Sequence, residues 1–479
     1  MRVQGHRLCS RVALLAETGH VLKTPAPNRH DPHLSLLSIL AFSGANLPTA
    51  ALSVAVFVFL PPYFAGHLGV AMTLVGGVWM GVRLFDIPVD VLLALGMDRT
   101  RTPVGRYRFW LILGAPILML ALYKLFMAPV GFGAIYLAGW LLVLYLGMSI
   151  TSLATSAWGA TLATRYHERS RLFGVLAATG VASALTVLMI PIVGQILGRT
   201  NAQSIQTMGW FIIALAPLGI GLAVVTTPET ISVPLPQSKG PRLAEILAVV
   251  AKPDLLRLFF AQIALTLGPG WMSAIYLFFF TQARRYSLQE ASLLLALYVS
   301  AGVPGALGAA ALARRIGKHN TLMVATTGFS LGLCTVLVIP KGNVLAAAPA
   351  MLWCGAMAAS FGLMIQAMLA DVGDEVRLEQ GKERMSLLYA MNALAGKLAA
   401  AFSIGLTFPL LAHLGFNPAE GAHNTHAAIS HLTWAFIAGP IVFVLLGGAC
   451  VVGWRLDARR QGEIREALDA RQALLQARG

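Results

Sequence analysis

The sequence predicts an all-α integral membrane protein with twelve transmembrane helices in two six-helix halves. Of its 479 residues, 57% are hydrophobic and only 11% are charged, whereas soluble globular proteins usually carry about 25% charged residues. Apolar runs of about 20 residues, long enough to cross a bilayer core, recur along most of the chain. A weak repeat relates the two halves, because the dipeptide Gly105-Arg106 stands at the start of the third apolar run and the similar dipeptide Gly317-Lys318 stands at the start of the ninth.

Short polar stretches separate the predicted spans. In order, these spans are 35–60, 69–97, 108–128, 132–163, 172–196, 207–227, 256–281, 291–313, 320–340, 345–371, 386–412 and 431–454. The longest connection between spans, Pro228 to Pro253, is rich in Pro, Ser, Lys and Glu and separates six spans from six. We therefore expect an N-terminal tail (1–34), a first half (35–228), a central loop (229–255), a second half (256–455) and a C-terminal tail (456–479).

The distribution of basic residues predicts the topology. Lys and Arg concentrate in the loops after spans 2, 4, 6, 8 and 10, whereas the opposite side holds only Lys124, Arg199, Arg284, Arg285 and Lys341. The positive-inside rule then places both tails and the central loop in the cytoplasm of a multi-pass protein of the cell (inner) membrane. The formal net charge of +15 reflects this topology, so we expect the lipid bilayer and not nucleic acid as a partner.

The N-terminal tail is basic and lacks the apolar core of a cleavable signal peptide. We interpret it as a cytoplasmic arm, with an organelle-targeting presequence as the alternative. The four cysteines lie far apart without metal-ligand spacing.

Three charged residues lie within the second predicted span. Arg83, Asp86 and Asp90 have the spacing i, i+3 and i+7, which places them on one helical stripe. Charges at mid-membrane are costly and normally face a bundle interior, where they act. Paired carboxylates can hold a monovalent cation or share a proton, so Asp86 and Asp90 are the candidate cation-binding residues. The alternative is a structural ion pair between Arg83 and Asp86, with Asp90 solvated.

Polar groups in other spans are candidates for contacting a substrate. Lys397 lies at mid-depth in the eleventh span, where a buried amine needs a partner. With Lys397 and Arg83 we group Asn46 of span 1, Thr155 and Trp158 of span 4, and Asn392 of span 11 as candidate substrate or coupling residues. Hydroxyls in helices often merely satisfy a carbonyl one turn back, which is the alternative for span 4.

The sequence lacks the motifs that are typical of several classes of protein. The sequence contains no Gly-rich phosphate loop, nucleophile elbow or metal-ligand helix motif. The histidines between spans 11 and 12 fit no regular metal-ligand spacing. We therefore expect neither an enzyme nor a metal site, and no cofactor apart from a coupling ion, H⁺ or Na⁺.

Three segments resemble a known family, the glycoside–pentoside–hexuronide:cation symporters, which are the melibiose-carrier group of the major facilitator superfamily. Arg83 to Asp90 (RLFDIPVD) and Met97 to Arg108 (MDRTRTPVGRYR) are similar to the family's span 2 signature and the loop that follows it. Tyr166 to Arg171 (YHERSR) and the stretch from Ala370 to Lys397 provide the second and third matches. The resemblance covers roughly residues 35–455.

The resemblance implies roles for particular residues. It implies that Asp86 and Asp90 bind the coupling cation and that Lys397 links the cation and substrate sites. It also implies cytoplasmic charge networks that hold the halves together in the outward-facing state, formed by Asp98 with Arg106 and by Asp371 with Asp374 and Arg384. The alternative for these loop charges is that they are simply solvated.

The sequence also departs from the family pattern. Span 1 has no acid and offers only Asn46, so a galactoside clamp of the melibiose-carrier design is in doubt. Val89 replaces a polar residue between the two span 2 acids and removes a candidate sodium ligand, which favours H⁺ coupling.

The leading hypothesis is a secondary active transporter, a monomer, that carries a sugar or glycoside-like solute together with a cation by alternating access. One alternative is a carrier of an amphipathic substrate such as a lysolipid, because the first span is rich in aromatic residues. A third hypothesis is a membrane sensor or scaffold on a carrier fold that transports nothing.

Overall fold

The fold of the first half is a bundle of long helices. We describe a computed structural model of the chain over residues 35–129, 131–162, 166–229, 252–380, 385–419 and 421–476. The first half contains α2 (Leu36–Ser43), η1 (Gly44–Asn46), α3 (Leu47–Val54), η2 (Ala55–Phe59), α4 (Leu60–Pro62), η3 (Tyr63–His67), α5 (Met72–Arg99), α6 (Arg106–Phe126), α7 (Ala134–Leu162), α8 (Tyr166–Ile196) and α9 (Asn201–Thr226).

The second half repeats this helical organisation and ends in an additional helix. It contains α11 (Pro253–Phe278), η4 (Phe279–Ala283), α12 (Leu288–Ser300), α13 (Gly302–Ile316), α14 (Lys318–Val338), α15 (Val344–Gln380), α16 (Met385–His413), α17 (His426–Ala449) and α18 (Ala458–Gln476). The all-helical membrane architecture is confirmed. The first predicted span is longer than expected, since its helical segments continue to His67.

Eleven helical stretches in the described parts of the chain are long and apolar enough to cross a membrane. α5 has the length of a span at 28 residues, but the charges on Arg83, Asp86 and Asp90 set it apart from the other eleven. The predicted eighth span is divided into α12 and α13 at Ala301. Pro304 explains this division, because proline has no N–H to donate to the carbonyl four residues earlier.

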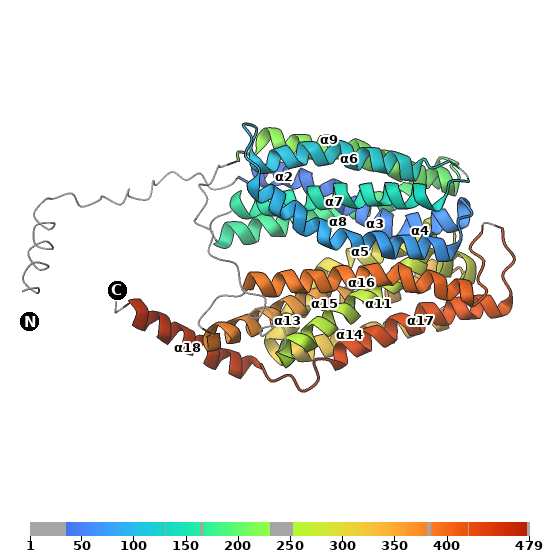
Figure 1. The fold of residues 1–479 in the computed structure, drawn as a ribbon. Coiled ribbons are helices and arrows are strands. Elements are labelled where there is room, and N and C mark those ends of the chain that lie inside the picture. Colours follow the sequence, from blue (N-terminus) through green and yellow to red (C-terminus); the bar gives the residue numbers. More distant parts are fainter. Residues whose placement is uncertain are drawn as a thin grey trace, which may run out of the picture.

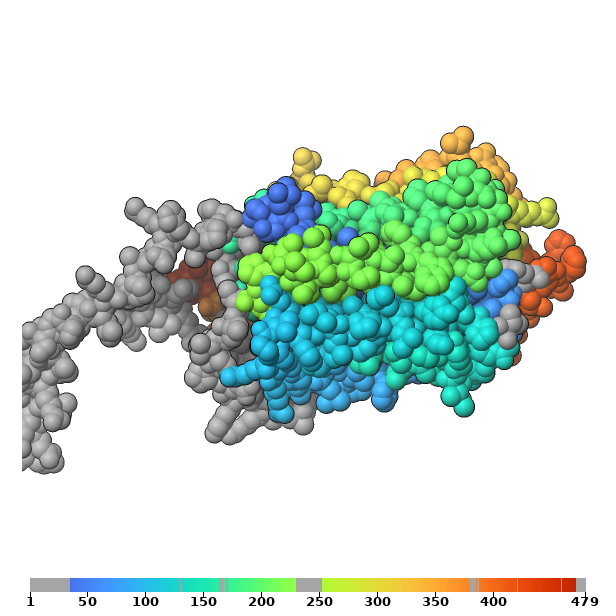
Figure 2. Space-filling model, turned by 90° about the horizontal axis from the view of Figure 1, so that it is seen from above, coloured from blue at the N-terminus to red at the C-terminus, as the bar shows by residue number. Residues whose placement is uncertain are grey.

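The two halves lie against each other as two layers, with α2 to α9 in one and α11 to α17 in the other (Figure 1). Two helix pairs form most of the contact between them: α5 packs on α16, and α8 packs on α12. Figure 2 shows the face formed by α6 and α9, with the green α8 bordering yellow segments of the second half. The start of α11 and α18 lie at one end of the bundle, which we call the termini end (Figure 1). Toward the opposite end, where α4 lies, a cavity lined in part by His67 opens, and we call this end the vestibule end.

Contact between α5 and α16 is tight toward the vestibule end and lost toward the termini end. A Cβ atom on Gly76 would lie 2.8 Å from Pro409 Cδ, and one on Gly405 would lie 2.6 Å from Met80 Cβ, so the two helices touch closely there. Ala94 lies one turn from Asp90 toward the termini end, and Ala393 lies one turn from Lys397 in the same direction. Both residues are exposed. The halves therefore separate at the termini end.

Within the first half, two glycines allow helices to approach backbone to backbone. A Cβ atom on Gly44 would lie 2.6 Å from the carbonyl oxygen of Gly219, and a Cβ atom on Gly219 would overlap the Gly44 carbonyl. Small residues of this kind permit close helix packing in membrane proteins. The contact fixes η1 against α9.

We predict that Gly219→Ala destabilises the protein, because neither backbone can move away without disturbing its helix. Overpacking of this kind typically costs about 1–3 kcal/mol. Gly221→Ala in the same helix is the matched control, because a Cβ atom there meets nothing within 4 Å. The thermal unfolding midpoint in detergent should fall for Gly219→Ala and stay level or rise for Gly221→Ala. Equal midpoints for the two variants would contradict the packing argument.

Candidate functional site

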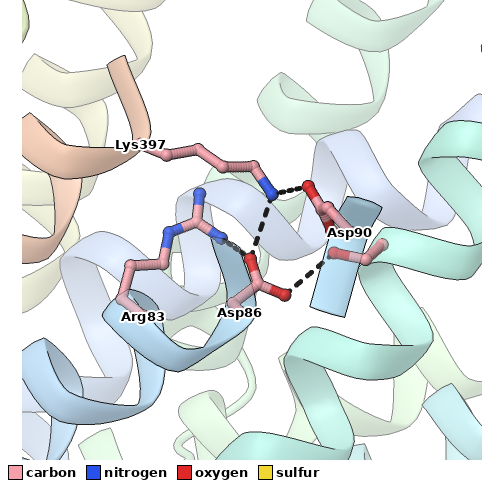
Figure 3. A network of polar contacts seen from close by, with 5 residues as sticks. Arg83, Asp86, Asp90 and Lys397 are labelled. Atoms are coloured by element: carbon pink, nitrogen blue, oxygen red, sulfur yellow. Dashed lines mark hydrogen bonds and ion pairs between the residues drawn. The ribbon is translucent and has the colours of Figure 1, made fainter. Parts of the chain in front are cut away.

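Four charged side chains meet where α5 packs against α16 (Figure 3). Arg83 Nη1 donates to Asp86 Oδ2 at 3.0 Å, and Lys397 Nζ donates to the same oxygen at 3.1 Å. Lys397 Nζ also donates to Asp90 Oδ2. The stripe predicted on span 2 thus faces the lysine predicted on span 11. Lys397 joins the two halves through ion pairs with both acids.

α7 adds two residues to this network that the sequence reasoning missed. Ser149 Oγ donates to Asp86 Oδ1 at 3.0 Å. The ring centroid of Tyr145, one turn earlier, lies 4.7 Å from the guanidinium carbon of Arg83, a cation–π distance. The available signal was their i, i+4 spacing, which places both side chains on one face of the span. With Ser149, Arg83 and Lys397, Asp86 has three hydrogen-bond donors.

Burial differs between the two acids. The Asp86 side chain is 2% exposed, whereas those of Asp90 and Lys397 are 18% and 25% exposed. Asp90 Oδ1 has no hydrogen-bond partner among the described residues. Asp86 is therefore fully engaged by protein groups, and Asp90 keeps one oxygen free to accept a proton or to coordinate a cation.

The other candidate residues lie outside this network. The Asn46 side-chain amide donates to the Leu176 carbonyl of α8 at 3.1 Å. Thr155 and Trp158 of α7 and Asn392 of α16 are all buried, and Thr155 Oγ1, Trp158 Nε1 and Asn392 Oδ1 have no hydrogen-bond partner among the described residues. Trp158 packs edge-on against Phe42, with ring centroids 5.2 Å apart. Thr155 and Asn392 lie one to two turns from the network toward the termini end.

Asp98, Asp371 and Asp374, three acids of the predicted charge networks, have their partners inside their own half. Asp98 pairs with Arg106, as the resemblance implies. Asp371 instead pairs with Lys318 of α14 at 2.6 Å. Asp374 accepts a hydrogen bond from Gln461 of α18 at 2.8 Å and lies 3.7 Å from Arg465. Arg384 lies outside the described residues, so a contact between halves in an outward-facing state stays a prediction.

Comparison with known families identifies the chain. A profile described as MFS/sugar transport protein matches residues 41–458, which include the whole charged network. The chain belongs to the MFS/sugar transport protein family. It is accordingly a multi-pass transporter of the major facilitator superfamily and not an enzyme.

Characterised relatives in this family are distant. The glucuronide carrier protein homolog of Escherichia coli (strain K12) is 22% identical over 444 residues, which cover 87% of this chain and 92% of that protein. The lactose permease of Lactobacillus delbrueckii subsp. bulgaricus is 23% identical, with 67% of this chain and 53% of the permease covered. The raffinose carrier protein of Pediococcus pentosaceus is 23% identical, with 78% and 61% covered. The match thus spans little more than half the length of the last two.

Solved structures share the fold at low identity. The nucleoside transporter NupG has a TM-score of 0.61 at 12% identity, covering 88% of this chain and 100% of that one. A bacterial homolog of the human lysosomal transporter Spinster, in an inward-facing and unoccupied conformation, has a TM-score of 0.62 at 12% identity, with 88% and 96% covered. These similarities establish the transporter fold and nothing about the substrate.

We predict that Ser149→Ala destabilises the protein by about 1–3 kcal/mol, the usual cost of leaving a buried acceptor without its donor. Ser152→Ala is the matched control on the same helix, because Ser152 is exposed and should change stability by less than about 0.5 kcal/mol. Thermal unfolding of both purified variants measures the difference. If the two variants unfold alike, Ser149 contributes nothing to holding Asp86.

Proposed function

We propose that the protein couples the transport of a sugar or glycoside-like solute to the symport of a cation by alternating access. The observation that carries this proposal is the ion-paired network between halves, in which one lysine of α16 binds two carboxylates of α5. Membership of a sugar transporter family supports it, and so do relatives whose names refer to lactose, raffinose and glucuronide transport.

Charge balance explains how ion binding could drive movement. Arg83 and Lys397 carry two positive charges, and Asp86 and Asp90 carry two negative charges, so the ionised network is neutral. A cation that binds Asp90 competes directly with the Lys397 ammonium for the carboxylate. Its entry weakens the contact between α5 and α16, because charge interactions are strong in a medium of low dielectric constant. The ion thereby shifts the equilibrium between conformations.

We place the substrate between the halves on the termini side of the network. A buried polar atom without a described partner lies in that direction on each half, at Thr155 of α7 and at Asn392 of α16. Trp158 of α7 lies among buried residues of the first half instead. Hydroxyl groups of a sugar can satisfy such atoms. Opening at the termini end, together with the positive-inside bias, supports an inward-facing arrangement with cytoplasmic termini. We also propose that the transporter is a monomer.

The charge on Asp86 should be essential for accumulation. We predict that Asp86→Asn reduces gradient-driven uptake of the transported sugar at least about tenfold in proteoliposomes, because coupling free energies typically reach 1–3 kcal/mol. The panel should contain lactose, raffinose and a glucuronide, each tested with an imposed proton or sodium gradient. Asp469→Asn, an exposed acid on α18, is the matched control and should transport normally. Accumulation that survives in folded Asp86→Asn would exclude this acid from coupling.

We favour the proton as the coupling ion because Val89 offers no ligand between the two acids. Addition of Na⁺ should then leave the thermal midpoint unchanged, and the dependence of that midpoint on pH should differ between the wild type and Asp86→Asn/Asp90→Asn. A ligand that binds only the folded state stabilises it by mass action. Stabilisation by Na⁺ that disappears in the double variant would establish a sodium site and overturn the proton assignment.

A small apolar pocket supports amphipathic cargo as a second candidate. It has a volume of about 150 Å³ and is lined by Val82, Phe85, Asp86, Val89, Leu142, Tyr145 and Leu146. Phe85 is 56% exposed, so an apolar chain could reach Asp86 from the outer surface of the bundle. Lysolipid-stimulated cation uptake would select this candidate. Intact function in Asp86→Asn, Asp90→Asn and Lys397→Ala would exclude both carriers and favour the sensor or scaffold.

A further inference from the structure

A separate cavity of about 770 Å³ opens at the vestibule end, and we call it the vestibule. Both halves line it. Its polar lining includes His67, Arg285, Lys341, His423 and His426. Its volume lies within the range of about 300–1,000 Å³ that is typical of small-molecule sites.

The vestibule is basic. Arg285 and Lys341 are exposed in it, and neither has an ion pair among the described residues. Three imidazoles add polar groups, from His67, His423 and His426, and no described lining residue is acidic. A concave surface lined by one sign of charge concentrates ligands of the opposite charge. The charges of the described lining therefore suit an anion.

The backbone holds Arg285 in an unusual conformation. Its φ of 61° is the one positive value for a non-glycine residue in the described chain, and such outliers cluster at functional sites. Neighbouring bonds fix the segment. The Arg284 carbonyl accepts from the Gly342 N–H at 3.1 Å, and the Tyr286 hydroxyl donates to the Asn343 carbonyl at 3.0 Å.

These bonds tie the segment that carries Arg285 to the loop that carries Lys341. Arg284 adds a third link, because its Nη2 donates to the Ile339 carbonyl at 2.9 Å. Arg285 and Lys341 are thus carried by two backbone segments that hydrogen bonds hold together. A backbone that is already held in place loses little further entropy when a ligand binds.

Buried apolar side chains lie between the vestibule and the charged network. Phe59 of η2 and Leu277 and Phe278 of α11 line the cavity and are buried. The Phe278 ring packs against Phe408 of α16, with centroids 5.9 Å apart. The helices here are locally π-helical, at η2, η3 and η4, a feature frequent at functional sites. A ligand in the vestibule thus occupies a site distinct from that of Lys397.

We propose that the vestibule binds an organic carboxylate about the size of a sugar ring, with Arg285 and Lys341 holding its carboxylate. Arginine offers paired donors that match this group. Since both halves line the cavity, occupancy stabilises the arrangement in which they meet at the vestibule end. This inference does not depend on the transported substrate or on the coupling ion.

Titration calorimetry of the full chain in detergent, with D-glucuronate and D-glucose as probes, tests the proposal. The two molecules share a ring and differ in charge. Glucuronate should bind at least about tenfold more tightly than glucose, and Arg285→Gly/Lys341→Ala should weaken glucuronate binding by a similar factor. Glycine is chosen because it adopts a positive φ without strain. Equal binding of both probes by the wild type would overturn the proposal.

Two further variants separate the vestibule from other sites. Lys124→Ala/Arg199→Ala removes the same charge from the vestibule end outside the cavity, because neither residue lines it, and should bind glucuronate normally. Lys397→Gln should also retain binding. If Lys397→Gln loses glucuronate while Arg285→Gly/Lys341→Ala keeps it, glucuronate binds in the central site and the vestibule assignment is wrong, although the proposed transport function would stand.

Discussion

The shared binding of the Lys397 ammonium by two carboxylates is the interaction around which the two halves are arranged. The cost of removing these charges from water is large, and buried ion pairs often add little net stability. Loss of one partner is nevertheless expensive, because it leaves an uncompensated charge. Such a contact suits a switch better than a permanent support, since its strength depends on what else binds the carboxylates.

The position of this interaction along α5 and α16 gives it mechanical importance. Toward the vestibule end, glycines let the two helices touch, as at Gly76 against Pro409. Toward the termini end, Ala94 and Ala393 are exposed and the helices part. The ion pairs therefore lie at the boundary between the closed and open parts of the interface. In the proposed alternating-access cycle, a small change in attraction there alters how far the halves can rock.

The sequence was sufficient to predict the helical membrane fold and the charged stripe, because hydrophobic length and the helical repeat are local properties. It could not reveal Ser149 as the partner of Asp86, since the rotation of α7 against α5 depends on packing across the whole half. The partners of Asp371 and Asp374 were missed for the same reason. Lys318 and Arg465 are remote in sequence, and a tail without apolar periodicity gave no sign that α18 would contact α15.

Charge neutrality restricts how the site can work. With two basic and two acidic groups, any added cation leaves one excess positive charge in a poorly solvated region unless Lys397 withdraws or a ligand supplies acceptors. Withdrawal separates α16 from α5, whereas a ligand with oxygen acceptors binds the displaced ammonium and keeps the halves together. In the proposed transport cycle, ion entry is thus favourable only with movement or with substrate. Since Asp90 has a free oxygen and Asp86 has none, the first cation should bind at Asp90.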